Sequence, residues 1–98
     1  MNIYNFTIPR TGESFNTLFQ NKNIEITQIV SSNKLNIKEY NQDVNEFVTL
    51  LEGKAKLEIE GKIKELSKGD YLYIPAHTKH RVLETSNGAL WLAIYFKN

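Results

Sequence analysis

The side chains with the widest chemical range in this sequence are its two histidines, His77 and His80, and the acidic Glu46. Imidazole nitrogens and carboxylate oxygens are both ligands of divalent metal ions, and both groups also transfer protons. Gln42 and Tyr40 precede Glu46 along the chain, and they would bring an amide oxygen and a phenol hydroxyl. These five residues are the candidates for metal binding or acid–base chemistry, provided that the fold brings them together.

Nucleophilic chemistry has little support. The chain contains no Cys, which excludes thiolate nucleophiles, disulfides and Cys-based zinc sites. Its serines lie in turn-like contexts and none falls in a Gly-x-Ser-x-Gly motif. There is also no glycine-rich loop of the kind that cradles a phosphate.

The elements that must position these residues are predicted to be strands, because apolar and polar residues alternate with a period of two and helical periodicity is nearly absent. Strands are predicted at residues 24–30, 35–38, 47–51, 55–60, 63–66, 71–74, 80–85 and 89–96. Only Ser14 to Gln20 could form a helical turn. About seven to nine short strands at such spacing predict an all-β fold, an antiparallel sandwich or barrel.

Two turns predict hairpins. Gly61-Lys62 separates strands 55–60 and 63–66, and Asn87-Gly88 separates strands 80–85 and 89–96. Tight hairpin turns need positive φ, so both Gly61 and Gly88 are predicted to adopt it.

The stretch from about residue 35 to residue 96 resembles the cupins, a family of small jelly-roll barrels. Their second motif, G-x5-P-x-G-x2-H-x3-N, is matched at Gly69, Pro75 and His80. It is not matched at His77, where cupins usually have Gly, or at Glu84, where they usually have Asn.

The first cupin motif, G-x5-H-x-H-x3,4-E-x6-G, is matched at Glu46 and Gly53 but not at its two histidines. Tyr40 and Gln42 occupy those positions. The string Tyr-x-Gln-x3-Glu, together with Ile-Pro-Ala-His-Thr-x-His-Arg-Val and Trp-Leu-Ala, is similar to a subgroup of small single-domain bacterial cupins.

The resemblance implies one cupin domain over residues 1–98, with a barrel core at about 24–96 and residues 1–23 packed on the barrel. Strand parity would then turn Glu46, Val48 and Leu50 into the barrel.

The resemblance also implies a divalent transition metal, one of Fe, Mn, Ni, Zn or Cu, at the barrel mouth. The implied ligands are Glu46, His80 and Gln42, with His77 as a further ligand or as a partner of one. The missing first-motif histidines should weaken binding, because imidazole is a better ligand for these metals than an amide oxygen. The alternative is a simple hydrogen-bonded pair of His80 and Glu46 without metal.

Two functions therefore remain open. One is a metal-dependent enzyme of dioxygenase, isomerase or lyase type, in which Tyr40 or His77 is the catalytic candidate that handles protons. The other is a non-catalytic binding or sensor cupin whose apolar barrel holds a small-molecule ligand without metal. In that case Tyr40 would only frame the pocket, and His77 would lie at the surface.

Composition limits the partners. The formal net charge is only +1 and basic residues alternate with acidic ones, which argues against nucleic-acid binding. No apolar run approaches the roughly 20 residues of a membrane span, and the N-terminus lacks a signal-peptide pattern, so a cytoplasmic location is expected. Phe47, Leu51 and Trp91 would suit a homodimer interface if they share an exposed sheet face.

Overall fold

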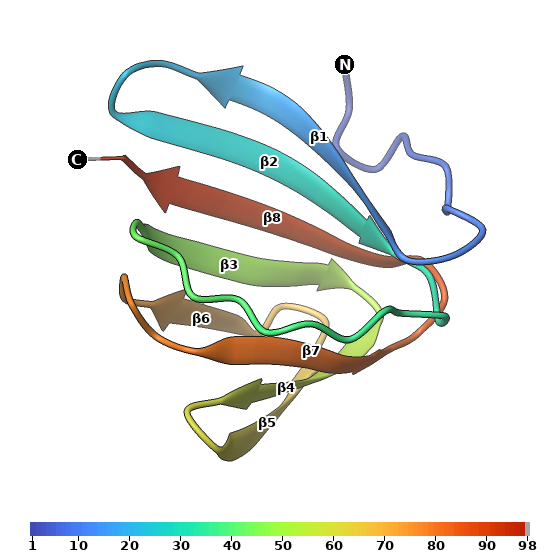
Figure 1. Cartoon of the computed structure of the whole chain (residues 1–98). Helices are drawn as coiled ribbons and strands as arrows, with labels where there is room; N and C mark the ends of the chain where they lie inside the picture. The colour runs from blue at the N-terminus through green and yellow to red at the C-terminus, as the bar shows by residue number, and fades with distance from the viewer. Residues whose placement is uncertain (98) are drawn as a thin grey trace.

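The computed structural model describes residues 1–97 as eight β-strands in two facing antiparallel sheets (Figure 1). The strands are β1 (Glu13–Gln20), β2 (Ile24–Ser31), β3 (Asn45–Glu52), β4 (Lys54–Ile59), β5 (Lys62–Ser67), β6 (Tyr71–Ile74), β7 (His80–Thr85) and β8 (Ala89–Phe96). The larger sheet has the order β1-β2-β8-β3-β6, and the smaller one has the order β5-β4-β7. This architecture confirms the predicted all-β jelly roll. Within residues 1–97 no helix is long and apolar enough to cross a membrane.

The core lies between the two sheets and is built by the predicted alternation. Glu46, Val48 and Leu50 of β3 are buried, while Phe47 and Thr49 between them point to the outer face. Because burial of apolar side chains is the main stabilising term, roughly 25 cal/mol per Å² buried, we expect the protein to stay folded without a bound ion. The site can therefore be varied without dismantling the sheets.

Two local predictions were wrong. Residues 35–38 form no strand and belong to the long connection between β2 and β3, which runs alongside β7 in Figure 1. Four residues with an exposed Ile37 find no neighbouring strand to pair with. Conversely, Ser14 to Gln20 is not helical but belongs to β1, which pairs with β2. Its aromatic and β-branched residues favour an extended chain.

The predicted hairpin between residues 80–85 and 89–96 was also wrong. β7 pairs with β4, whereas β8 pairs with β2 and β3, so the Asn87-Gly88 turn passes from one sheet to the other. The turn is held from outside: the N–H of Ser86 donates to the carbonyl of Lys54 at 2.9 Å, and that of Gly88 to the carbonyl of Ser31 at 2.8 Å. The Asn-Gly dipeptide thus predicted correctly that the chain turns here, but it did not predict which strands β7 and β8 pair with.

The hairpin of β4 and β5 is confirmed, and both glycines have the predicted positive φ, 82° at Gly61 and 89° at Gly88. We expect Gly61→Ala to destabilise the protein by about 1 kcal/mol through backbone strain alone, because a Cβ there meets open space. Gly88→Ala should cost more, since its Cβ would lie 2.8 Å from Cδ1 of Ile8. Urea unfolding measures both values, and two neutral substitutions would contradict the turn assignments.

Candidate functional site

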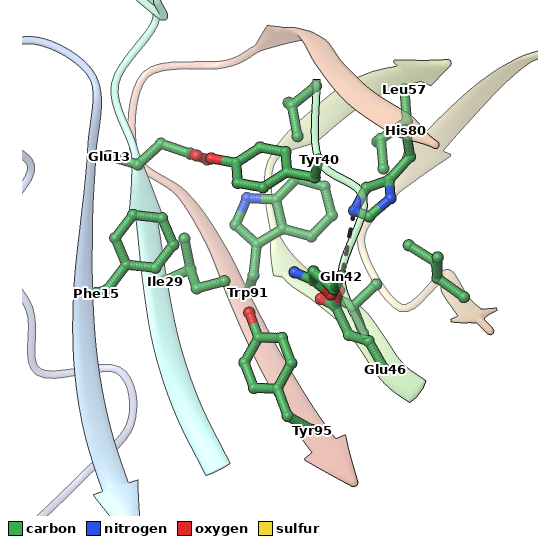
Figure 2. A pocket seen from close by; sticks show the side chains of 13 residues that line it. Glu13, Phe15, Ile29, Tyr40, Gln42, Glu46, Leu57, His80, Trp91 and Tyr95 are labelled. Atoms are coloured by element: carbon green, nitrogen blue, oxygen red, sulfur yellow. Dashed lines mark ion pairs between the residues drawn. The ribbon is translucent and has the colours of Figure 1, made fainter. Parts of the chain in front are cut away.

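A pocket opens between the two sheets, beside the β2–β3 connection (Figure 2). Its volume is about 60 Å³, and since one water needs roughly 10–15 Å³ this is room for a few small atoms. The lining is mainly apolar and aromatic, with a few convergent polar groups. It comprises Glu13, Phe15, Ile29, Tyr40, Gln42, Glu46, Val48, Leu57, Ile74, His80, Val82, Trp91 and Tyr95.

Glu46 of β3 and His80 of β7 face each other across the pocket from opposite sheets. Oε1 of Glu46 lies 4.0 Å from Nε2 of His80, and each side chain is only 7% exposed. The other ring nitrogen, Nδ1 of His80, lies 2.9 Å from the carbonyl oxygen of Thr78. Because a carbonyl only accepts, Nδ1 carries the proton in the neutral ring, and the lone pair of Nε2 is directed toward Glu46.

Two further acceptors lie buried beside this lone pair. Oε1 of Glu46 and Oε1 of Gln42 have no hydrogen-bond partner among the described residues. Burial raises the pKa of Glu46 to about 7, although the Gln42 amide favours the charged form. The unpartnered Oε1 atoms of Glu46 and Gln42, together with the lone pair of Nε2, form a site that a cation or a proton would satisfy.

The donor set fits a metal ion only in part. Within residues 1–97 no group of three or more His, Asp and Glu side chains is placed to hold one. The set is therefore one imidazole, one carboxylate and one amide oxygen. With metal–ligand bonds of about 2.0–2.2 Å, two ligands of one ion lie roughly 3–4 Å apart, so the 4.0 Å separation of Glu46 and His80 admits an ion between them.

Tyr40 and Gln42 reach the pocket on the β2–β3 connection, which two sets of backbone hydrogen bonds hold in place. Tyr40 and His80 exchange N–H···O bonds of 2.7 and 3.0 Å, and the N–H of His77 donates to the carbonyl of Gln42 at 2.6 Å. The Tyr40 ring stacks on His80 with centroids 5.6 Å apart. Burial and the carboxyl groups of Glu13 and Glu46 raise the pKa of the Tyr40 hydroxyl. Tyr40 thus remains a protonated hydroxyl at the pocket wall.

The structure does not bring His77 to the other candidates. Its side chain is exposed and is absent from the pocket lining. Its backbone has a φ of 64°, the left-handed region that favours glycine. This conformation explains why the motif usually has Gly at that position, and it leaves His77 with a backbone role in holding the Gln42 loop.

We therefore expect His77→Gly to leave the free energy of unfolding unchanged or to raise it by up to about 1 kcal/mol. Glycine removes the strain of the left-handed conformation, and its greater freedom in the unfolded chain offsets part of this gain. Denaturant unfolding measures the difference. A loss of more than about 1 kcal/mol would show that the imidazole itself makes a stabilising contact.

Sequence reasoning missed Glu13 and Phe15, because β1 was read as a helical turn. Glu13 accepts a hydrogen bond from the hydroxyl of Ser31, which in turn accepts one of 3.0 Å from Nε1 of Trp91. Burial raises the pKa of Glu13. Strand parity, which places Glu13 and Phe15 on the same face of β1, was the signal that could have found them.

Strand parity and register decide on which face Trp91 and Glu84 lie. Trp91 is 3% exposed and lines the pocket, so it does not share the outer face with Phe47 as the homodimer prediction required. Glu84 turns away from the pocket after a register shift between β4 and β7, and its carboxylate lies 3.8 Å from Nζ of Lys56. Glu84 therefore pairs with Lys56 outside the pocket.

A two-sheet antiparallel jelly roll with polar residues at one mouth defines the cupin class. The sequence model of the cupin domain matches residues 30–95, and the chain belongs to this family. A sequence relative, an uncharacterized protein of Aquifex aeolicus (strain VF5), is 40% identical over 47 residues, which are 48% of this chain. The match spans only 39% of that relative's length.

Solved structures agree with this assignment. A protein of Ralstonia eutropha JMP134, described as a candidate mannose-6-phosphate isomerase, is 28% identical with a TM-score of 0.86, covering 100% of this chain and 97% of the other. A cupin superfamily protein of Desulfitobacterium hafniense DCB-2 is 17% identical with a TM-score of 0.83 over 95% and 84% of the two chains. An RmlC-like cupin of Shewanella frigidimarina NCIMB 400 is 18% identical with a TM-score of 0.80 over 89% and 78%. At these low identities, the Desulfitobacterium and Shewanella structures show only that this chain has the same fold.

Proposed function

We propose that this cupin binds one divalent transition metal ion, of the series Fe, Mn, Ni, Zn and Cu, at the mouth of its barrel. Glu46 and His80 are the principal ligands and Gln42 supplies a third, neutral oxygen. The observation that supports this most directly is that the buried Oε1 atoms of Glu46 and Gln42 have no hydrogen-bond partner and that Nε2 of His80 lies 4.0 Å from this oxygen of Glu46. A cation there would satisfy all three at once.

The surrounding residues support such a site. The hydrogen bond to the Thr78 carbonyl holds the His80 ring and selects the neutral tautomer in which Nε2 carries the lone pair. Tyr40 stacks on the same ring, and its hydroxyl is placed to hold or donate a proton. An ion in this pocket would act as a Lewis acid on an oxygen of a small ligand. The apolar walls of Val48, Ile74 and Val82 would exclude water from it.

The pocket lining does not favour a hexose phosphate, because it includes no Lys or Arg to pair with a phosphate. The activity in the description of the Ralstonia protein is therefore not proposed for this chain.

The test is a calorimetric titration of metal-free, untagged protein with Ni²⁺, Zn²⁺ and Mn²⁺. We expect one ion per chain for at least one of them. Glu46→Gln should lower the affinity by more than about 100-fold, because it removes the only charged ligand while keeping the shape. Glu52→Gln on the same strand is the matched control and should bind as the parent does. An absence of binding by all three ions would overturn the metal proposal.

One observation favours a second candidate, a metal-free pocket that binds a small molecule. The pKa of Glu46, raised to about 7 by burial, keeps a proton on this carboxyl over part of the neutral range. A protonated Glu46 would donate a hydrogen bond to the Nε2 of His80 or to a ligand. If the titration shows no metal, this candidate replaces the first.

A further inference from the structure

The outer faces of the two sheets differ in charge. On the smaller sheet, cross-strand ion pairs join Arg81 to Glu58 and Lys56 to Glu84. On the larger sheet, residues directly opposite each other on neighbouring strands form one row across all five strands, and such partners share a face. Phe47 points to the outer face, so the whole row does. The row consists of Phe19, Ile26, Ile94, Phe47 and Tyr73.

The two adjacent rows are also free of charged residues. One contains Asn16, Gln28, Leu92, Thr49 and Tyr71, and the other contains Ile24, Phe96 and Asn45. A solvated sheet face normally carries polar and charged side chains, as that of the smaller sheet does. The N-terminal segment lies over one end of the larger sheet, where the side-chain amide of Gln28 donates to the carbonyl of Ile3 at 2.7 Å. We call the surface beyond this end the apolar face: the row from Phe19 to Tyr73 together with Leu92, Tyr71, Ile24 and Phe96.

Much of the apolar face is in contact with solvent. Phe19, Tyr71 and Tyr73 are 54%, 66% and 56% exposed, and Phe96 is 37% exposed. Since a large aromatic side chain covers roughly 150–250 Å², these four leave about 400 Å² of each copy exposed. The half-buried aliphatic residues of β2 and β8 add to this area. Two such faces would together bury more than the roughly 1,000 Å² that a specific interface needs.

The absence of charge indicates which surface covers the apolar face. A charged surface placed on it would lose hydration without gaining an opposite charge. A second copy carries no charge to bury, and identical faces related by a two-fold axis form the commonest homodimers. With this axis along the central strand β8, Phe19 of one copy lies opposite Tyr73 of the other. Ile26 then lies opposite Phe47, and Ile94 meets its own copy at the axis.

We propose that the protein forms a two-fold homodimer in which the apolar faces of two copies pack against each other. The two larger sheets would lie face to face at about 10 Å, the usual spacing of packed sheets. Along β3, Phe47 enters this interface, while Glu46 and Val48 line the pocket on the other side of the sheet. The dimer therefore does not depend on a bound metal ion, and it goes beyond the proposed function.

Sedimentation equilibrium of untagged protein with a chelator, from low micromolar to several hundred micromolar, measures the dimer Kd. We expect the mass of two chains at the higher concentrations. Ile94→Lys should raise the Kd by at least about 100-fold, because it sets two lysines against each other at the axis. Ile63→Lys is the matched control, since Ile63 is 52% exposed and lies opposite Glu58 on the charged sheet. Its Kd should stay within about twofold of the parent's.

Tyr73→Lys is a second variant should Ile94→Lys fail to fold, because Tyr73 is exposed on the edge strand β6. It should raise the dimer Kd at least about tenfold through the loss of an aromatic contact from each copy. Crosslinking tests the geometry independently, since the chain has no Cys. A short bismaleimide should link two chains of Ile94→Cys, and it should not link two chains of Ile63→Cys.

A parent that sediments as one chain at every concentration would overturn the proposal, even if another protein or a lipid surface binds the apolar face. A dimer whose Kd is unchanged in Ile94→Lys and in Tyr73→Lys would overturn it too, because its interface would lie elsewhere. Weakened association in these two variants, with Ile63→Lys dimeric like the parent, would support the apolar face as the interface.

Discussion

His80→Ala is expected to lower the affinity for Ni²⁺, Zn²⁺ and Mn²⁺ by more than about 100-fold, while His77→Ala keeps it within about threefold. Loss of an outer partner of a metal ligand already costs roughly 10–100-fold, and loss of one of only two strong ligands costs more. His80 directs the free lone pair of Nε2 at Glu46, whereas the exposed His77 lies outside the pocket. Calorimetric titration of the three metal-free proteins measures these affinities.

The two histidines control for each other, because they lie three residues apart on one turn and are the only histidines in the chain. Both variants should stay folded, as judged by far-ultraviolet circular dichroism, since the buried apolar core is expected to supply most of the stability. If His80→Ala bound every ion as well as the parent does, the metal proposal would fail and the metal-free pocket would take its place. A large loss in His77→Ala would instead show that the turn moves its imidazole to the metal in solution.

The sequence was sufficient to predict the fold class and to place Glu46 and His80 in one pocket. Period-two alternation along β3 placed Glu46 and Val48 inside, and this parity follows from strand geometry alone. The glycine, proline and histidine of the second cupin motif located His80 at the start of β7. These features depend on residues that are close together in the sequence, and they can therefore be predicted from one sequence alone.

The errors concern interactions between residues far apart in the chain. The Asn87-Gly88 turn has the same sequence whether the strands around it pair with each other or with strands of different sheets. Glu13 becomes part of the site only because β1 pairs with β2, which brings its carboxyl to Ser31. The place of His77 depends on a backbone conformation, φ 64°, that its spacing from His80 does not reveal.

Glu46 also makes the stability of the metal-free protein depend on pH. Its pKa is about 7 in the folded state, where burial disfavours the charged form, against an ordinary value of 4.5. Between these values the folded state binds more protons than the unfolded state, so stability falls as pH rises. The stabilisation is fully present below about pH 4.5 and lost above about pH 7. A pKa difference of about 2.5 at ~1.4 kcal/mol per unit makes this loss on the order of 3 kcal/mol.

We therefore expect Glu46→Gln to be more stable than the parent at pH 8 by up to about 3 kcal/mol, because the amide has the same shape and no charge to bury. Urea unfolding at pH 5, 6, 7 and 8 in the presence of a chelator measures both proteins. The parent should lose stability across this range and the variant should lose much less, with Glu13 supplying a residual slope of the same sign. A parent whose stability is flat or rises from pH 5 to 8 would show that the Glu46 carboxylate is well solvated.

The same urea unfolding experiment tests whether a metal ion compensates the buried charge of Glu46. An ion that binds only the folded state adds about 2.7 kcal/mol at one hundred times its Kd, which is close to the loss expected from ionised Glu46. Adding the ion that the parent binds should therefore restore most of its stability at pH 8 and leave Glu46→Gln unchanged. Equal stabilisation of both proteins would place the ion elsewhere on the surface. The carboxylate that destabilises the metal-free barrel would then have no part in binding.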